Sequence, residues 1–220
     1  YGDIISRLED HVTSVRQKTT PIIDFEKNNS LTGLNYLNDL YQAILNQQPL
    51  SLKYRSFKAR SAATFVFYPY LLKEYRNRWF VFGSKKNTRM LYNLALDRIL
   101  ELAPAKDEPY YGNSNFDPST FFDDIVGVTK GINQHPEEVR FWVNPEHAYV
   151  LTKPIHKSQH LIEQREDGSM VFQITVVINH ELQREILGFG DGIRVLYPAS
   201  LVRFMKSKFR SGSQLYTEDI

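Results

Sequence analysis

Residues 50–99 read LSLKYRSFKARSAATFVFYPYLLKEYRNRWFVFGSKKNTRMLYNLALDRI, and this stretch decides the fold of the first half of the chain. Apolar and polar residues alternate in it, as on the two faces of β-strands, over four runs: 50–57, 64–72, 78–84 and 88–97. Polar clusters that favour turns separate the runs: KARSA at 58–62, KEYRNR at 73–78 and SKKNT at 84–88. Four or five short antiparallel strands with tight turns predict a small barrel or a strongly bent sheet, with Pro69 at an edge or a bulge.

The same region concentrates positive charge and aromatic surface. Residues 51–100 contain eleven Lys or Arg, opposed only by Glu74 and Asp97, whereas the whole chain has a net charge of +2. Eleven aromatic residues lie in the same fifty positions. Because cations bind phosphate and aromatic rings stack on bases, we expect a nucleic acid or a nucleotide as the partner.

Two helices are predicted before the strands. Apolar residues recur at helical spacing in 1–17 and in 31–47, and Pro49 ends the second helix. Residues 31–50 contain no Lys or Arg, which a helix lying along DNA phosphates needs, so we do not interpret the pair as a helix-turn-helix. We interpret 1–48 as a helical linker or dimerisation segment. Since the sequence does not begin with Met, we expect further coding sequence upstream.

After the strands, the composition changes. Residues 104–137 are rich in Pro, Gly, Asn and acidic residues, and we predict a linker with a short helix near 118–126. Residues 138–220 then show strand, helix, two strands, helix, strand and a closing helix: 139–143, 145–155, 159–166, 170–178, 180–190, 193–198 and 199–213. Asp167-Gly168 is a strong hairpin signal between the two central strands. The βαββαβ order predicts a ferredoxin-like domain, and the chain as a whole is predicted to be α+β.

Five elements, in order, resemble the WYL domain, a family named for the motif Trp-Tyr-Leu. They are Ala43-Ile44, the strand LSLKY ending at Tyr54, the run Pro69-Tyr70-Leu71-Leu72, the triplet Trp79-Phe80-Val81, and the box Leu96-Asp97-Arg98-Ile99. Two later segments, 156–169 and 181–198, resemble the C-terminal extension domain of the same family. The resemblance covers about residues 35–215.

This resemblance implies an Sm- or SH3-like β-barrel at 49–103, behind the N-terminal helices. It also implies that the chain is the ligand-sensing region of a bacterial, cytoplasmic transcription regulator. In such a regulator the barrel binds nucleic acid or a nucleotide. A DNA-binding helix-turn-helix upstream and a homodimer are implied in the same way, with no cofactor. Two positions depart from the family: Phe80 lacks the hydroxyl of the motif Tyr, and Ala95 stands where a basic residue is usual. Arg89 shares a strand face with position 95 and is expected to replace that residue.

The ligand-binding candidates are cations and aromatic residues on or beside these strands: Tyr54, Arg55, Arg78, Trp79, Phe80, Arg89 and Arg98. Each has a structural alternative. Trp79 and Phe80 point to opposite faces of a strand, so one of them belongs to the core, and Trp79 is the better candidate for that role. Arg98 can pair with the neighbouring Asp97, and the other arginines can lie in solvent. Tyr54 and Arg55 also face opposite ways.

A second basic track is predicted on the closing helix, where Arg203, Lys206 and Arg210 recur at helical spacing. The alternative is a solvated helix face. We expect these side chains to contact phosphates only if the helix lies beside the barrel, or beside the barrel of a partner subunit.

No catalytic or metal site is predicted. The chain has no Cys, which excludes disulfides, thiolate metal sites and cysteine nucleophiles, and fits a reducing compartment. His156 and His160 are four residues apart, but Pro154 and the strand-like sequence after it argue against a helix that would join them on a metal. The HELQRE sequence at 180–185 is not HExxH, and GFGDG at 188–192 follows a helix, so it is not a phosphate loop. No apolar run is long enough for a membrane helix.

Two other functions stay open from the sequence. One is a non-catalytic accessory module that regulates a nucleic-acid-processing enzyme and has no DNA reader of its own. The other is an enzyme that acts on nucleic acids or nucleotides, for which no nucleophile motif is found.

Overall fold

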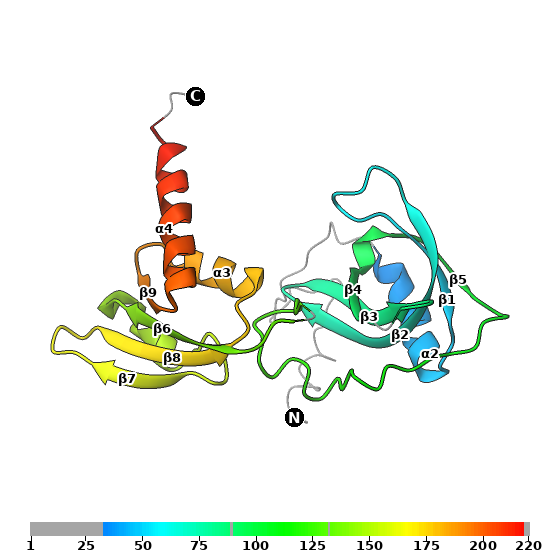
Figure 1. Cartoon of the computed structure of the whole chain (residues 1–220), viewed down its shortest axis with the longest axis horizontal. Helices are drawn as coiled ribbons and strands as arrows, with labels where there is room; N and C mark the ends of the chain where they lie inside the picture. Colours follow the sequence, from blue (N-terminus) through cyan, green and yellow to red (C-terminus); the bar gives the residue numbers. More distant parts are fainter. Residues whose placement is uncertain (1–32, 89, 132, 218–220) are drawn as a thin grey trace, which may run out of the picture.

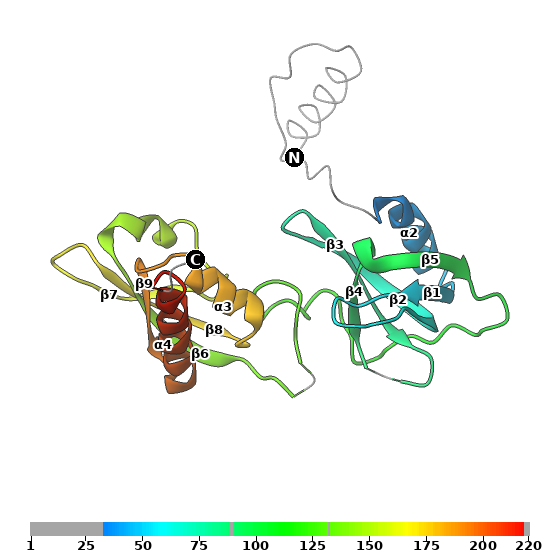
Figure 2. The same ribbon diagram turned by 90° about the horizontal axis from the view of Figure 1, so that it is seen from above.

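The computed structural model describes residues 33–88, 90–131 and 133–217. They form two bodies side by side, each built on an antiparallel sheet (Figures 1 and 2). The predicted α+β class is therefore confirmed. The helix predicted at 1–17 and the candidate Arg89 lie outside the described residues.

The first body is a five-stranded sheet of order β4-β3-β2-β1-β5. Its elements are η1 (Leu34–Tyr36), α2 (Leu37–Leu45), β1 (Leu50–Tyr54), β2 (Ala63–Tyr75), β3 (Arg78–Lys85), β4 (Tyr92–Ala95), η2 (Leu96–Arg98) and β5 (Ile99–Pro104). The first three predicted strands are confirmed, and the run 88–97 contains a shorter strand than predicted, β4, which continues into η2. β4 pairs with β3 and β5 pairs with β1, so the chain must turn at η2 to cross from one edge of the sheet to the other.

The register explains the position of Pro69. The pairing of β2 with β3 shifts between Pro69 and Leu71, as expected at a residue that has no N–H to donate to the ladder. Pro69, predicted at an edge or a bulge, lies at a bulge. The core of this body lies between α2 and the sheet, where Leu40, Leu52, Phe67 and Val81 are fully buried. Each such side chain contributes about 1.5–3 kcal/mol by leaving water.

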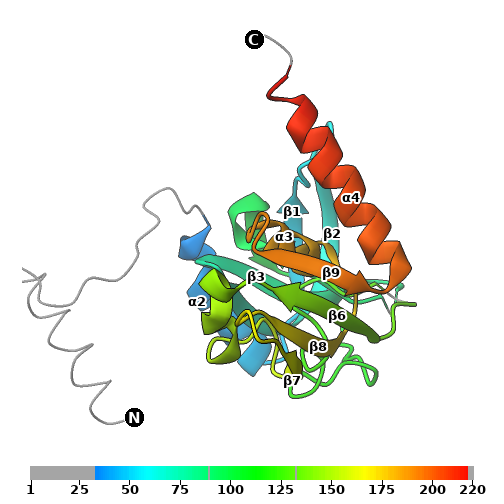
Figure 3. The same ribbon diagram turned by 90° about the vertical axis from the view of Figure 1, so that its left-hand side faces the viewer.

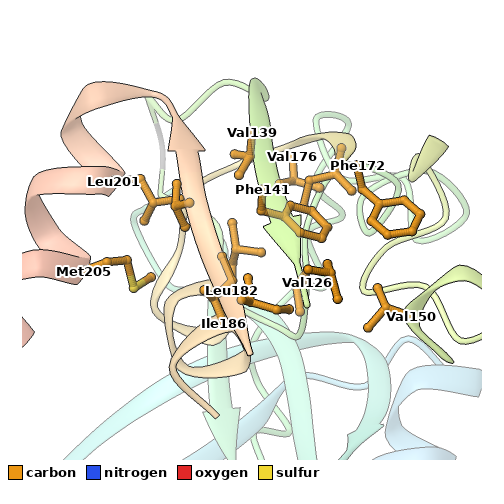
Figure 4. Close-up of a cluster of buried hydrophobic side chains, with 14 of the residues drawn as sticks. Val126, Val139, Phe141, Val150, Phe172, Val176, Leu182, Ile186, Leu201 and Met205 are labelled. Atoms are coloured by element: carbon orange, nitrogen blue, oxygen red, sulfur yellow. The ribbon is translucent and has the colours of Figure 1, made fainter. Parts of the chain in front are cut away.

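The second body is a four-stranded sheet of order β7-β8-β6-β9. Its elements are β6 (Glu137–Val143), η3 (Pro145–Leu151), β7 (His160–Gln164), β8 (Met170–Val176), α3 (His180–Leu187), β9 (Ile193–Tyr197) and α4 (Ala199–Gln214). Helices α3 and α4 lie on the same face of the sheet (Figures 1 and 3). Their buried residues Leu182, Ile186, Leu201 and Met205 meet strand residues such as Phe141 in one core (Figure 4).

One helix prediction in this body is corrected. The segment 145–155 forms only the 3₁₀ element η3, with a non-helical backbone at His147. The backbone N–H and the ring Nδ1 of His147 both lie within hydrogen-bond distance of Asn144 Oδ1, at 3.0 and 2.7 Å, and this tightens the first turn. Pro154, whose ring cannot continue a helix, follows shortly after.

The segment between the sheets contains no helix among its described residues, which corrects the helix predicted near 118–126. Residues 118–124 form hydrogen-bonded turns, with Asp117 accepting from the N–H groups of Thr120 and Phe121. Phe121 and Phe122 both contact the ring of Phe82, with centroids 5.9 and 5.2 Å away. Successive residues on a helix point about 100° apart, so a helix would turn one of these rings away from Phe82.

A candidate nucleic-acid groove between the two sheets

An open groove of about 380 Å³ lies where the two bodies meet, and we term it the junction groove. The first sheet, the connecting segment and α3 all contribute to it. Its lining residues are Tyr54, Tyr75, Arg76, Arg78, Phe80, Asn93, Ala95, Arg98, Val128, Thr129, His180, Glu181 and Arg184. Four of the predicted site residues, Tyr54, Arg78, Phe80 and Arg98, are therefore brought together.

The β2–β3 hairpin supplies one wall. Arg76 and Asn77 both adopt positive φ, of 51° and 60°, which makes the tight turn that fits the twist of paired strands. Beyond the turn, Arg78 and Phe80 share one face of β3, and the guanidinium carbon of Arg78 lies 5.5 Å from the centroid of the Phe80 ring. Trp79 points to the other face and packs against the core. The structure thus places Trp79 in the core and Phe80 in the groove.

Asp97 pairs with Arg78 rather than with its neighbour Arg98. The Arg78 guanidinium donates to both carboxylate oxygens, at distances from 2.9 to 3.1 Å. This fork geometry fixes the Arg78 side chain beside the groove. Arg98 has no carboxylate within salt-bridge distance among the described residues, and its guanidinium carbon lies 5.4 Å from the Phe57 ring centroid. The Tyr54 hydroxyl accepts a hydrogen bond from the Ala95 N–H at 3.4 Å, and both residues line this side of the groove.

Helix α3 forms the opposite wall. Asn179 caps it, because its side-chain Oδ1 accepts from the Leu182 N–H at 2.8 Å. The amide of Asn179 also donates to the carbonyls of Val126 and Thr129, both at 2.8 Å, so the cap holds the connecting segment against α3. From the other side, Asn93 in β4 donates to the Val128 carbonyl at 2.8 Å. The segment is therefore fixed to both bodies at the groove.

Glu181 of α3 is a buried carboxylate at the groove and is only 7 % exposed. Its Oε1 accepts from the Val128 N–H at 3.3 Å, and its Oε2 lies 3.2 Å from Nδ1 of His180. Gly127, with φ of +85°, passes so close that a Cβ there would meet the Glu181 side chain at 2.5 Å. Glu181 therefore acts as part of the joint between α3 and the connecting segment.

The groove holds more positive than negative charge near its surface. Arg76 pairs with Glu185 of α3, across the two bodies, and Arg78 pairs with Asp97. Within the described part of the chain, Arg98 and Arg184 make no salt bridge. Burial raises the pKa of the Tyr75 hydroxyl above its ordinary value, so this aromatic side chain stays neutral at physiological pH. Unpaired guanidinium groups beside aromatic faces can bind phosphates and stack on bases.

Among the groove residues that sequence reasoning missed are Tyr75, Arg76, His180 and Arg184. Tyr75 and Arg76 had a usable signal, because a turn at Arg76-Asn77 brings the residues around it to one hairpin end. His180 and Arg184 had none, because nothing in the spacing of α3 says that this helix faces the first sheet.

The remaining candidates lie elsewhere. Arg55 is exposed and lines a neighbouring cavity of about 370 Å³, together with Ser56, Phe57, Ala59, Asp97, Arg98 and Leu100, which we term the loop pocket. Arg203, Lys206 and Arg210 are exposed on α4, and none of them lines the junction groove. The helix projects from the second body (Figure 1). The structure therefore does not join the second basic track to the groove.

A larger cavity, of about 710 Å³, opens between the β3–β4 turn and residues 108–115. It contains Lys85 and Lys86 but none of the predicted ligand-binding residues. The Lys86 ammonium pairs with Glu108, and the Lys85 ammonium lies 4.1 Å from the Phe65 ring centroid. The candidate site is therefore the junction groove, which is smaller but gathers four of the predicted residues.

Within 33–88, 90–131 and 133–217, no group of three or more His, Asp or Glu residues is placed to hold a metal ion. His156 is buried, its Nδ1 lies 2.8 Å from the Ser158 hydroxyl, and burial lowers the pKa of its imidazole, while His160 is exposed on β7. None of the described helices has the length and apolar character to cross a bilayer.

Comparison with known proteins places these elements in families. Residues 35–104 match the WYL domain and residues 135–211 match the WCX domain. No curated protein matches the chain. Among solved structures, it is similar to proteasome accessory factor B/C (PafBC) of Arthrobacter aurescens, with 16 % identity and a TM-score of 0.34 over 83 % of this chain and 27 % of that one. It is also similar to a CRISPR Cas-related protein, with 11 % identity and a TM-score of 0.48 over 84 % of this chain and 52 % of that one.

The chain thus spans about a quarter of the first of these structures and about half of the second. The family matches cover both bodies described above, the first sheet with its preceding helix and the second sheet with α3 and α4. The resemblance found in the motif residues is confirmed: the chain carries a WYL domain followed by a WCX domain.

Proposed function

We propose that this chain is the ligand-sensing region of a WYL-type transcription regulator, and that the junction groove binds a nucleic acid or a nucleotide. The observation that carries the proposal is the convergence of four arginines and three aromatic rings on one groove. Two of the arginines, Arg98 and Arg184, keep their guanidinium groups free of carboxylates among the described residues. Free cations beside ring faces match the phosphates and bases of such a ligand.

The position of the groove supports a sensing role. Arg98 belongs to the WYL domain and Arg184 to the WCX domain, so a phosphate held by both would bridge the two domains. A ligand shifts a conformational equilibrium only by its difference in affinity for the two states. A ligand that contacts both walls of the groove has different affinities for two states of the protein. It binds more tightly when the two domains lie as in this structure than when they are apart.

We also propose a fold type for each of the two sheets. A helix followed by a sheet of order β4-β3-β2-β1-β5 is compatible with an Sm-like barrel, and the order β7-β8-β6-β9 with a ferredoxin-like domain. The homodimer, the DNA-binding domain upstream and the cytoplasmic location stay predictions from the resemblance. So does the absence of catalysis.

The proposal is tested with the double variant Arg98→Ala, Arg184→Ala and a fluorescent single-stranded oligonucleotide, by anisotropy over a salt series. Hydrogen bonds to charged groups contribute about 1.5–3 kcal/mol each, so we expect at least about 100-fold weaker binding. The slope of log affinity against log salt should fall by about 0.7 for each lost phosphate contact.

The control is the double variant Arg140→Ala, Arg165→Ala, which removes the same charge. Both of these arginines lie in the WCX domain and pair with carboxylates on its surface, Arg140 with Glu138 and Arg165 with Glu163. This variant should keep the affinity within about twofold of the unmodified protein. Equal losses in the two double variants, or no loss in either, would exclude the groove as the binding site.

A further inference from the structure

The cavity of about 710 Å³ between the β3–β4 turn and residues 108–115, which we term the turn cavity, is separate from the junction groove. Among the described residues, none lines both cavities. Cavities of about 300–1,000 Å³ hold small-molecule ligands, so the turn cavity has room for one. The proposed function makes no use of this space.

A buried hydroxyl at the turn cavity lacks a hydrogen-bond partner. Tyr68 of β2 lines the cavity and is only 3 % exposed, and its hydroxyl bonds to no other described residue. Burial, and after it the Glu108 carboxylate, raise the pKa of this hydroxyl, whereas the Lys86 ammonium lowers it, so the hydroxyl lies near both charged groups of the cavity. A buried hydroxyl without a partner is unfavourable, and most such groups in native proteins are satisfied. A ligand in the turn cavity can supply that partner.

The wall that the connecting segment contributes is fixed to the sheet. The Tyr70 hydroxyl donates to the Tyr111 carbonyl at 3.0 Å, and the Tyr110 hydroxyl donates to the Pro69 carbonyl at 2.8 Å. The Tyr111 ring packs edge to face against the Tyr68 ring, with centroids 5.6 Å apart, yet Tyr111 remains 59 % exposed. The cavity therefore has an aromatic ring that is held in place and still open to a ligand.

The charges of the turn cavity nearly cancel. Lys86 pairs with Glu108, and the Lys85 ammonium lies 4.1 and 4.6 Å from the ring centroids of Phe65 and Tyr92. The carboxylate repels phosphate and carboxylate groups, and a paired ammonium attracts them only weakly. The ligand that fits this site is therefore uncharged.

The other polar groups of the turn cavity are hydroxyls and amides, which both donate and accept hydrogen bonds. They belong to Ser84, Asn87, Thr88, Asn113, Ser114 and Asn115. A ligand complementary to them carries several hydroxyl groups, and one complementary to Tyr111 has a flat apolar face. A pyranose sugar combines the two, because its hydroxyls lie around the ring and its C–H groups form an apolar face.

We propose that the turn cavity is a second ligand site, which binds a neutral carbohydrate of one or two sugar rings. The Tyr68 hydroxyl and the Glu108 carboxylate bind sugar hydroxyls, and the Tyr111 ring packs against the apolar face of the sugar. This site goes beyond the proposed function and does not depend on it, since the two cavities use different residues.

The test is calorimetry on the whole chain with four disaccharides: maltose, cellobiose, lactose and mannobiose. At least one of them should bind with a Kd of about 1 mM or tighter. Tyr68→Phe removes only the hydroxyl and should weaken the binding of that sugar at least about fivefold. The variant should be no less stable than the unmodified protein, because the group that it loses has no partner. Tyr111→Ala should weaken the binding about tenfold.

Tyr149→Phe is the matched control, because Tyr149 is an exposed tyrosine of η3 and does not line the turn cavity. This control and the groove variant Arg98→Ala, Arg184→Ala should each keep the affinity for the sugar within about twofold. If no disaccharide reached the expected affinity, or if Tyr68→Phe bound the sugar as tightly as the unmodified protein, the carbohydrate site would be overturned.

Two further outcomes would also overturn the carbohydrate site. Loss of sugar binding in the groove variant would place the sugar in the junction groove instead. Glucose 6-phosphate that bound more than about tenfold more tightly than glucose would exclude a neutral ligand. Neither outcome bears on oligonucleotide binding by the groove, which is measured separately.

Discussion

The junction groove and the exposed face of α4 are both basic, but their cations have different surroundings. In the groove, Arg76 and Arg78 are held by carboxylates and Arg98 lies against an aromatic ring, all within a concave surface. On α4, the basic side chains are exposed, and the helix projects from its domain (Figure 1). Binding costs the freedom of every long side chain that it immobilises. The difference suggests that side chains fixed in advance bind more tightly than an equal number of mobile ones.

The largest effect should come from breaking the joint on which the groove depends. In Gly127→Ala, a side chain is forced to a φ of +85° and meets Glu181 at 2.5 Å. We expect a loss of about 2–3 kcal/mol in the free energy of unfolding of the WCX domain, measured by urea titration of Trp142 fluorescence in a Trp79→Phe background. Oligonucleotide binding should weaken at least tenfold, because the Val128 segment and α3 separate.

Gly212→Ala is the matched control for this substitution. Gly212 lies in α4, and a Cβ added there meets no atom within 4 Å. Alanine favours helix over glycine by up to about 1 kcal/mol, so this variant should be as stable as the unmodified protein or slightly more stable. If Gly127→Ala were as stable as Gly212→Ala, the groove would not depend on a close fit at the joint.

The groove also shows which features of the site local sequence patterns predict and which they do not. Alternation along 78–80 predicts that Arg78 and Phe80 share a face and that Trp79 lies opposite, since this depends only on the two-residue period of a strand. The cap at Asn179 and the bulge at Pro69 are equally local, and both are found. The contribution of α3 depends on how the two domains meet, which no local pattern encodes.

Local sequence patterns also fail to predict the ion pairs of the groove and the conformation of the connecting segment. Asp97 precedes Arg98 in the chain but pairs with Arg78 of the adjacent hairpin, so neighbours in sequence were a poor guide to partners. The turns at 118–124 replace a predicted helix because several aromatic side chains must reach Phe82 together. Such competition between local preference and packing is resolved only by the folded arrangement.

An intermediate effect is expected from Asp97→Asn, which removes the carboxylate that holds Arg78. Because the carboxylate fixes Arg78 beside the groove in advance, its removal should weaken affinity for a single-stranded oligonucleotide about two- to fivefold, as measured by anisotropy. Glu101→Gln removes the same charge from a carboxylate that pairs with Lys53 on β1, and it should change affinity by less than twofold. A rise in affinity in Asp97→Asn that shrinks with added salt would instead show that the carboxylate competes with ligand phosphate for Arg78.

The smallest effect should come from the triple variant Arg203→Ala, Lys206→Ala, Arg210→Ala, although it removes more charge than any other change considered. These side chains are exposed and line no part of the junction groove, so they reach a short ligand only through screened, long-range attraction. We expect affinity for a dinucleotide to change by less than about twofold at physiological salt. The association rate should fall moderately at low salt, because steering depends on total charge. Stopped-flow fluorescence over a salt series separates the two quantities. A tenfold loss of affinity that persists at high salt would place phosphate contacts on α4, and the contrast between fixed and mobile cations would then fail.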